Sequence, residues 1–432
     1  MKKLLATLLA STMALSAVSG LVACGEDEKT LTVWAPEAAI NVYKQRVADW
    51  KKDNEQYKDW KVDFVVKAEG EAETDLGVDP TKGADIFFFE AGQIATMESK
   101  AYLQTLTADY STLIKERDSA ASYEPVERGD RMIAFPATSD NGYFMYYDKT
   151  FFSPTEVESL DSMLAKMEGT DKKIMFPYDD GYYQVTWFIG TGCTMDWVDE
   201  DQTKYFTDIH NTPAGLTAGK ASIKYLGGHK NKWVTGGTGR MIQGFGDGTV
   251  VAAFSGTWGA QGTAQDGSLK TAIENGTREN KNYDEVVGAV KCPTFTFEDK
   301  TYQMGSFVGG KYCGVNRYKN NAETITASMS LANYFTDERG QMLRFQATEA
   351  GPSNKVVAEK DEVKNNMLLS ALAAQNAAGG YAQLSQNGLW DAMKAFGTGC
   401  WDGTITEAGL QTALNDLATA MAKGGQLVTS KE

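Results

Sequence analysis

Aromatic residues stand beside acidic and other polar residues at several points of this sequence. Aromatic residues make up 11% of the 432 residues, with 9 Trp and 19 Tyr, and many lie in turn-like polar contexts instead of inside apolar stripes. The stretch FPYDDGYYQVTWF at 176–188, which follows a predicted strand, mixes both kinds. Aromatic faces and carboxylate acceptors together suit a polar ligand with flat faces. We therefore expect a binding cleft lined by such residues.

Residues for other kinds of chemistry are scarce. The two histidines, His210 and His229, have no second His or Cys at metal-ligand spacing, and no CxxC pattern is present, so we expect no zinc site. Neither histidine lies near a GxSxG motif, which argues against a serine hydrolase triad. The run GFGDG at 244–248 does not complete GxGxxG, so a dinucleotide site is unsupported. We expect neither a cofactor nor a metal.

The N-terminus carries the features of a lipoprotein signal peptide. Lys2 and Lys3 precede an uncharged run at 4–23, which ends in LVACG at 21–25. Small residues before Cys24 give a signal peptidase access, and the thiol can accept a diacylglycerol before cleavage. An uncleaved membrane helix is the alternative, because 4–23 has about the ~20 residues needed to span a bilayer. The acidic residues at 26–28 disfavour that alternative.

Export and lipidation would leave a mature chain of 409 residues, enough for two or three domains. A lipidated tether at 24–30 would hold it to the cell membrane on the extracytoplasmic face. The formal net charge is -15, and without Lys2 and Lys3 it is -17. Such a charge argues against a nucleic-acid partner and against binding of the protein body to anionic lipid.

Four cysteines remain once Cys24 carries a lipid: Cys193, Cys292, Cys313 and Cys400. An even number in an exported chain permits disulfides, although their pairing is not readable. Buried free thiols explain them equally well.

The hydrophobic pattern predicts alternating strands and helices. The first elements are a strand at 31–34, a helix over 40–50, strands at 60–66 and 86–89, and a helix beginning at Ile94. This β-α-β-α order implies an α/β sheet with helices on its faces. Later, 249–254 predicts another strand. Thr404 and Glu407 predict a capping box for a helix that carries apolar residues at 410, 414, 417 and 421 on one face.

Several segments, taken together, carry a family resemblance that runs from about Leu31 to Met421. They are LTVWAPE at 31–37, ADIFFFEAGQIATMESKAYLQTL at 84–106, FPATSDNGYFMYYDK at 135–149, FSGTWG at 254–259, SFVGGKYCGVNR at 306–317, ANYFTDERGQ at 332–341 and GPSNK at 351–355. In this order they resemble the maltose-binding type of extracellular solute-binding protein, the receptor component of ATP-binding-cassette sugar importers.

The resemblance implies a two-lobed α/β fold of the periplasmic-binding-protein type, with the ligand held between the lobes. The N-terminal lobe would comprise 31–138 plus 286–336, and the C-terminal lobe 142–284 plus 340–432. The first crossing between them would include 139–142. The family also implies a monomer that delivers an oligosaccharide to a permease with two membrane subunits and a cytoplasmic ATPase. Maltose or a maltodextrin is the expected ligand, and no enzymatic activity is expected.

The resemblance also implies which residues contact the sugar. Trp258 matches a stacking tryptophan directly after a strand, and Trp390, after Gln386 and Asn387, resembles another stacking position with helix packing as the alternative. Phe89 matches an aromatic cleft position, although apolar runs of this kind usually belong to the core. Other expected contacts, each also explicable as a loop, turn or core residue, are Glu37, Gln93, Ser139, Asp140, Asn141, Asp179, Tyr182, Tyr183 and Trp187.

One departure from the maltose-binding pattern concerns Gly92 and Gln93, which replace an aspartate-arginine pair. A charged contact to sugar hydroxyls is therefore missing there, which leaves the sugar, its linkage and its length open. Two alternatives remain. The same scaffold could hold another glycan or solute, and two acids about 5–10 Å apart among Glu37, Asp140 and Asp179 would suit a glycoside hydrolase.

Overall fold

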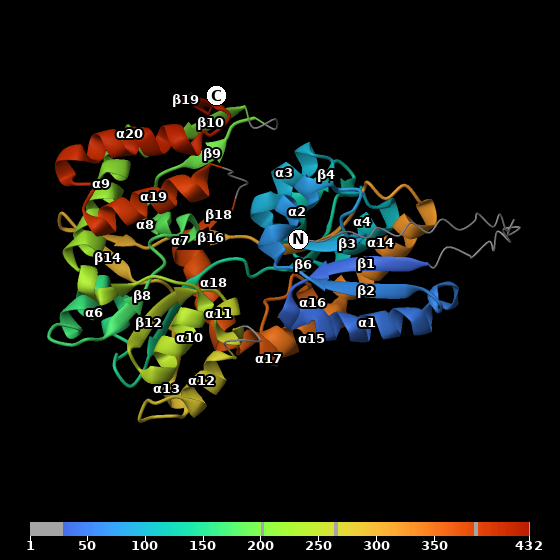
Figure 1. Cartoon of the computed structure of the whole chain (residues 1–432), viewed down its shortest axis with the longest axis horizontal. Helices are drawn as coiled ribbons and strands as arrows, with labels where there is room; N and C mark the ends of the chain where they lie inside the picture. Colours follow the sequence, from blue (N-terminus) through green and yellow to red (C-terminus); the bar gives the residue numbers. More distant parts are fainter. Residues whose placement is uncertain (1–28, 200–202, 263–266, 384–387, 432) are drawn as a thin grey trace, which may run out of the picture.

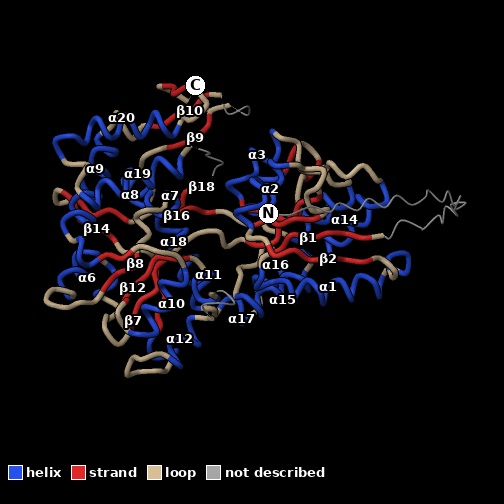
Figure 2. Tube along the Cα trace, viewed as in Figure 1, coloured by secondary structure: helices blue, strands red, loops and turns tan. Residues whose placement is uncertain are grey.

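The computed structural model describes residues 29–199, 203–262, 267–383 and 388–431. The expected lipidation site, Cys24, lies outside these ranges. Two α/β lobes lie side by side, and the chain passes between them three times (Figure 1). Each lobe has a central five-stranded sheet flanked by helices (Figure 2), which confirms the expected two-lobed α/β fold. Among the described residues, no helix has the length and apolar character needed to cross a membrane.

The first lobe is built on a sheet of strand order β2-β1-β3-β17-β6. These strands are β1 (Thr30–Ala35), β2 (Lys61–Val66), β3 (Ile86–Glu90), β6 (Phe135–Thr138) and β17 (Lys311–Val315), with a hairpin of β4 (Glu127–Arg128) and β5 (Arg131–Met132) beside them. Its helices are α1 (Ile40–Asp53), α2 (Ala72–Val78), α3 (Ile94–Ser99), α4 (Ala108–Arg117), α5 (Ala120–Tyr123), α14 (Ala322–Thr336), α15 (Glu338–Thr348), α16 (Lys355–Ala358) and α17 (Asp361–Lys364).

Packing in this lobe explains the hydrophobic patterns of its strands. β1 buries every second residue, whereas β3, in the middle of the sheet, buries its apolar run on both faces. The ring of Tyr43 on α1 stacks on Phe88 of β3, with centroids 4.5 Å apart, and is fully buried. The predicted helix and strand thus meet through the residues that the periodicity singled out.

The second lobe contains a sheet of order β11-β8-β12-β7-β13. The strands of this lobe are β7 (Phe144–Asp148), β8 (Lys173–Met175), β9 (Met195–Trp197), β10 (Lys204–Thr207), β11 (Trp233–Val234), β12 (Val250–Ser255), β13 (Val287–Val290), β14 (Thr294–Phe297), β15 (Lys300–Gln303), β16 (Ser306–Val308), β18 (Gly380–Ala382) and β19 (Gln426–Val428). Its helices are α6 (Leu160–Lys166), α7 (Gly181–Gln184), α8 (Thr186–Thr191), α9 (Pro213–Ser222), α10 (Thr238–Asp247), α11 (Trp258–Gln261), α12 (Leu269–Asn275), α13 (Tyr283–Val286), α18 (Met367–Gly379), α19 (Leu389–Asp402) and α20 (Leu410–Met421).

The C-terminal helix forms without the capping box expected for it. The apolar residues at 410, 414, 417 and 421 all lie buried on one face of α20, as the pattern predicts. Thr404, however, donates its hydroxyl proton to Asp402 at 2.7 Å, and a short 3-10 turn at Glu407–Gly409 leads into the helix. Thr404 thus stabilises the turn that follows α19 and does not cap α20.

The three crossings join the lobes at successive points. The chain leaves β6 at Thr138 and enters β7 at Phe144, returns between β16 and β17 through residues 309–310, and crosses again between α17 and α18. Two stretches differ from the expected division: the strands from β13 to β16 lie in the second lobe, and the helices from α15 to α17 lie in the first. β13 pairs antiparallel with β7, so 287–290 belongs to the second sheet and not to the first lobe.

α15 is the converse case, because 340–432 was expected in the second lobe. Its Arg344 donates to the hydroxyl of Tyr43 on α1 at 2.8 Å, and the helix packs on α1 and α14. The ladder of β13 and the buried hydrogen bond of Arg344 decide these positions. Both interactions join residues more than 100 positions apart, and the local sequence pattern does not report them.

The four cysteines within the described ranges are buried and free. Burial raises the pKa of each of these thiols. Of the two sequence-based alternatives, the structure therefore has the unpaired thiols.

Candidate functional site

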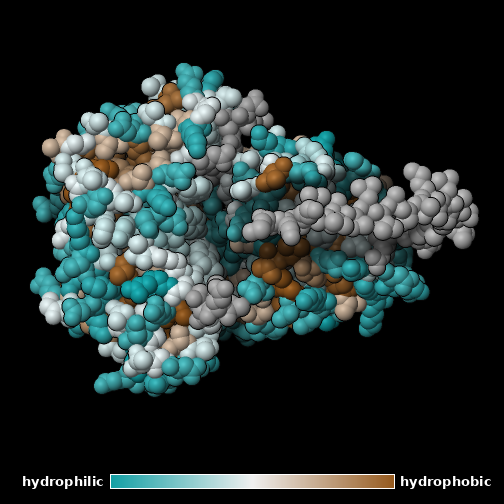
Figure 3. Space-filling model, viewed as in Figure 1, coloured by the Kyte–Doolittle hydropathy of each residue, from teal (hydrophilic) through white to brown (hydrophobic). Residues whose placement is uncertain are grey.

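A cleft runs along the boundary between the lobes, where the surface is hollowed (Figure 3). It contains three neighbouring cavities of about 610, 680 and 560 Å³. Trp258 lines all three, and the first two also share Glu69 and Lys311. Residues of both lobes line the first two cavities, whereas second-lobe residues alone line the third, which adjoins the others at Trp258.

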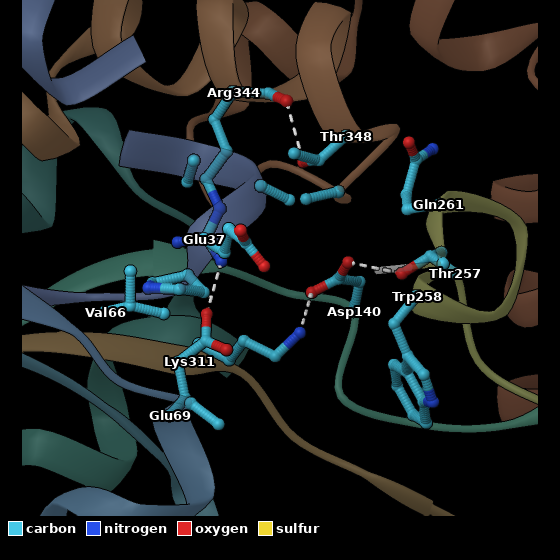
Figure 4. A pocket seen from close by; sticks show the side chains of 16 residues that line it. Glu37, Val66, Glu69, Asp140, Thr257, Trp258, Gln261, Lys311, Arg344 and Thr348 are labelled. Carbon is cyan, nitrogen blue, oxygen red and sulfur yellow. Dashed lines mark hydrogen bonds and ion pairs between the residues drawn. The ribbon is translucent and has the colours of Figure 1, made fainter. Parts of the chain in front are cut away.

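Trp258 begins α11, three residues after β12 ends at Ser255 (Figure 4). A Cβ atom at Gly256 would lie 2.1 Å from the indole ring, so glycine is needed for the ring to fold back over the backbone. The ring is half-buried, and the ammonium group of Lys311 lies 5.4 Å from its centroid. This arrangement leaves a flat aromatic surface partly open to the cleft.

Asp140 lies on the first crossing and is almost fully buried, at 1% exposed. Its Oδ2 accepts hydrogen bonds from the Thr257 hydroxyl at 2.8 Å and from the Gly351 amide at 3.0 Å. Its Oδ1 lies 3.8 Å from the Lys311 ammonium (Figure 4) and has no hydrogen-bond partner among the described residues. Burial alone would raise the pKa of Asp140, but the charge of Lys311, the nearby hydroxyl groups of Thr138 and Thr257 and the charge of Arg344 together outweigh it and lower the pKa. The carboxylate is therefore ionised with one oxygen uncommitted.

A second ion pair supports the first-lobe wall of the same cavity. Arg344 on α15 donates to the Glu69 carboxylate at 2.6 Å, and both side chains are largely buried. Glu37, which follows β1, lines this cavity and is exposed. The wall thus combines one neutralised acid with one solvated acid.

The 680 Å³ cavity is aromatic on the second-lobe side and acidic on the first-lobe side. Tyr182, Tyr183 and Trp390 line it from α7 and α19, opposite Glu90 at the end of β3. Burial, together with the nearby carboxylate of Glu69, raises the pKa of Glu90 to about 7, although the charge of Lys311 opposes this. Glu90 therefore changes its charge within the physiological pH range.

Two amide side chains in this cavity are engaged in protein contacts. Gln93 donates to the Gly70 carbonyl at 2.8 Å and accepts from the Glu90 amide at 3.2 Å, as part of a capping box. Asn141 donates to the Gln383 side chain at 2.6 Å. Gln383 follows β18 of the second lobe, so this bond ties that lobe to the crossing.

The 560 Å³ cavity continues past Trp258 and Trp390 toward Asp179 and Asp180. Asp179 accepts a hydrogen bond from the Thr235 hydroxyl. Asp180 caps α7 by accepting from the Tyr182 amide at 2.9 Å, and burial raises its pKa. The turn that the sequence left as an alternative is thus real, and its acids still face the cleft.

Most of the expected contact residues meet in this cleft. Those that line its cavities are Glu37, Gln93, Asp140, Asn141, Asp179, Tyr182, Tyr183, Trp258 and Trp390. Ser139 is exposed on the crossing and does not line them.

Phe89 and Trp187 do not fit the expectation. Both are 0% exposed, Phe89 in the first-lobe core against Tyr312 and Trp187 in the second-lobe core against Tyr225. A fully buried ring has no face to offer a ligand. Both rings therefore pack in a hydrophobic core and do not line the cleft.

Sequence reasoning missed Lys311, Arg344, Glu69 and Glu90. Lys311 had a visible signal, since it is the one charged residue of the otherwise apolar strand KYCGV at 311–315. Arg344 and Glu69 are 275 positions apart in the chain, and their pairing has no local signature. Within the described ranges, no group of three or more His, Cys, Asp or Glu residues is placed to hold a metal ion.

Comparisons with known proteins place this geometry in context. Residues 45–371 match the family model described as bacterial extracellular solute-binding protein. The curated proteins contain no match. Among solved structures, a protein solved with acarbose is 24% identical, covers 92% of this chain and 99% of its own, and has a TM-score of 0.77.

Two further structures share the fold. The maltodextrin-binding protein MalE1 from L. casei BL23 is 19% identical over 91% of this chain and 98% of its own, with a TM-score of 0.72. The maltotriose-binding protein of Thermus thermophilus, bound with maltotriose, is 15% identical over 91% and 99%, with a TM-score of 0.70. The family match covers most of the chain and the fold agrees with it: the chain belongs to the bacterial extracellular solute-binding proteins.

Proposed function

We propose that this protein captures an α-linked gluco-oligosaccharide, of the maltose or maltodextrin kind, and delivers it to the permease of an ATP-binding-cassette importer. The observation that carries the proposal is the half-buried ring of Trp258, shared by three cavities, with the ionised Asp140 beside it. A pyranose offers an apolar C–H face to such a ring and hydroxyls to such an acceptor. Structures of the same fold that hold acarbose or maltotriose support this ligand class.

The proposed contacts divide by chemistry. Trp258, Trp390, Tyr182 and Tyr183 supply faces on the second-lobe side of the cleft. The acceptors are Glu37 and Asp140 near the first cavity and Asp179 in the third, with Asn141 and Gln93 contributing amide groups that are already hydrogen-bonded within the protein. Ser139 would contact a ligand only if lobe closure brought the exposed crossing toward it. Phe89 and Trp187 act through core packing alone.

Lobe closure follows from where the contacts lie. Because a ligand in the cleft touches both lobes, it binds more tightly when the lobes approach each other, and the population shifts toward the closed form. The three crossings permit that motion. In the proposed cycle, the closed and loaded form is the one that the permease and its ATPase accept.

A lipid on Cys24 would keep this receptor near the importer. A diacylglyceryl group supplies two acyl chains, which is enough for stable anchoring, and confinement to the membrane raises the local receptor concentration. The extracytoplasmic side follows from the family, and the protein acts there as a monomer. Replacing Cys24 by Ala is expected to release the protein from the membrane fraction.

Isothermal titration with maltose and longer maltodextrins tests the ligand. We expect binding, and we expect chromatography to recover the ligand intact after long incubation. Trp258→Ala is expected to weaken binding by about tenfold or more through loss of the stacking surface, without loss of the fold. Trp401→Ala is the matched control, since Trp401 stacks on Tyr178 and lines none of the three cavities.

Two results would contradict the proposal. Release of shorter sugars would identify a glycoside hydrolase, and failure of every glucan to bind, with binding of another solute, would reassign the cleft. A lowered melting temperature with unchanged affinity in the Trp258 variant would place that ring in the core.

A further inference from the structure

Lys311 and Asp140 form an ion pair that is left incomplete on its cleft side. Their charged atoms are 3.8 Å apart, which exceeds the length of a direct hydrogen bond. Both residues are more than nine-tenths buried, at 7% and 1% exposed. The Oδ1 atom of Asp140 has no hydrogen-bond partner within the described ranges, although Oδ2 has two.

Buried polar atoms in native proteins are nearly always hydrogen-bonded. We therefore expect a third group, from a ligand or a water, to bind between Asp140 Oδ1 and the Lys311 ammonium. The ammonium is separately placed 5.4 Å from the Trp258 ring centroid, and all three residues line the 610 Å³ cavity (Figure 4). A group that enters here meets a donor, an acceptor and an aromatic face at once. One water could bridge the charges, but it would leave the ring face unused.

We propose that Lys311 is a specificity-determining residue that, with Asp140 Oδ1, clamps two adjacent hydroxyl groups of one sugar ring stacked on Trp258. Lys311 donates to the oxygen of one hydroxyl, and the neighbouring hydroxyl donates to Asp140. Adjacent ring hydroxyl oxygens are separated by roughly one hydrogen-bond length, about 2.8 Å. Such a pair fits between charged atoms 3.8 Å apart, with each hydroxyl reaching one of them.

The clamp rests on the proposed function, because it assumes that the ligand is a sugar. It adds a requirement that a lone carboxylate does not impose. A carboxylate accepts from any hydroxyl, whereas the Lys311–Asp140 pair requires one hydroxyl that accepts and a neighbour that donates. Hydrogen bonds to charged groups are also the stronger ones. A ring that lacks either hydroxyl leaves a buried charge unpaired and is rejected.

The test pairs protein variants with ligand variants, measured by isothermal titration. The ligands are maltotriose and monodeoxy maltotrioses in which one ring hydroxyl at a time is replaced by hydrogen. For the unaltered protein, we expect about tenfold or greater weakening for two analogues that lack adjacent hydroxyls of one ring. Lys311→Met should bind maltotriose about tenfold more weakly, yet bind one of those two analogues as tightly as the unaltered protein binds it.

The matched control is Lys319→Met. Lys319 pairs with Asp85 at the same 3.8 Å but lines none of the cleft cavities, so its loss should leave every affinity unchanged. Equal weakening of all ligands by Lys311→Met would show that Lys311 only supports the fold, and would overturn the inference. Sensitivity to non-adjacent hydroxyls in the unaltered protein would overturn it too, and that measurement decides the matter even if the variant does not fold.

Failure of the proposed function looks different. If the unaltered protein bound neither maltotriose nor a longer maltodextrin, the ligand class and the clamp would both be wrong. If it bound maltotriose and the deoxy analogues equally, sugar capture would stand and only the clamp would fall.

Discussion

Glu90 makes the stability of the protein depend on pH in a direction opposite to that of most carboxyl groups. Its pKa rises from an ordinary 4.5 to about 7, chiefly because of burial, with Glu69 adding negative potential. The folded state therefore holds this proton more tightly than the unfolded state. The stabilisation is fully present below pH 4.5 and is lost as the pH rises through about 7.

The size of the effect follows from the two pKa values. Each unit of pKa difference is worth about 1.4 kcal/mol, so complete ionisation of Glu90 removes up to about 3 kcal/mol from the free energy of unfolding. Glu90→Gln keeps a polar side chain of the same length without the ionisation. At pH 8 we expect the variant to be more stable than the unaltered protein, with the advantage vanishing near pH 4.5.

Urea denaturation at pH values from 4.5 to 8 measures this difference. Comparing the two proteins at each pH cancels the titration of groups that both share. Glu37→Gln controls for the loss of one negative charge, because it removes an exposed carboxylate from the same cleft. Parallel stability curves for the Glu90 variant and the unaltered protein would refute the reasoning, as would a Glu37 variant that behaves like the Glu90 variant.

Two further changes probe the second lobe and the contact between lobes. Arg278 donates to the buried Asp148 carboxylate at 2.7 Å, so Arg278→Met should lower the free energy of unfolding by about 3–5 kcal/mol in urea denaturation, and a loss under 1 kcal/mol would contradict this. A Cβ atom at Gly92 would lie 2.7 Å from the Gln383 amide nitrogen of the other lobe. Because this amide is the end of a flexible side chain, Gly92→Ala should displace it and cost its hydrogen bond with Asn141, lowering the free energy of unfolding by about 1 kcal/mol in urea denaturation. Gly77→Ala, whose Cβ meets only ordinary contacts, should show no such loss, and an equal effect of the two changes would contradict the reasoning.

The local hydrophobic pattern was sufficient to predict the strands and the helix that pack against the first-lobe core. The alternation at 60–66 and the apolar run at 86–89 predicted β2 and β3 to within a residue or two, because the period of a strand is visible in any half-buried sheet. The helical spacing of Tyr43 and Trp50 likewise predicted α1, whose two large rings are both fully buried.

The lobe assignment of whole elements was harder. β13 and α15 each have ordinary local sequences, and what places them is pairing with partners far away in the chain. The same limit applies to the cleft. Asp140 and Trp258 were expected because each matches a cleft position in the family that the sequence resembles. Lys311 and Glu69 acquire their roles only when the fold brings them beside Asp140 and Arg344.

Phe89 shows how a plausible position fails. It adjoins Glu90, which faces the cleft, but successive residues of a strand point to opposite faces. Its ring therefore packs 5.6 Å from Tyr312 inside the first lobe. Its aromatic side chain and its position beside Glu90 suggested a contact with the ligand, but the alternation of side chains along the strand directs its ring into the core.

The position of β17 in the first sheet has a consequence for how the protein folds during its synthesis. β17, at Lys311–Val315, lies between β3 and β6, so its residues are synthesised after every strand of the second five-stranded sheet. The nascent chain emerges N-terminus first and holds β3 and β6 without the strand that joins them. Contacts across such long separations form slowly. A polypeptide that completes its first lobe so late is expected to finish folding that lobe only after every strand of both sheets has been synthesised.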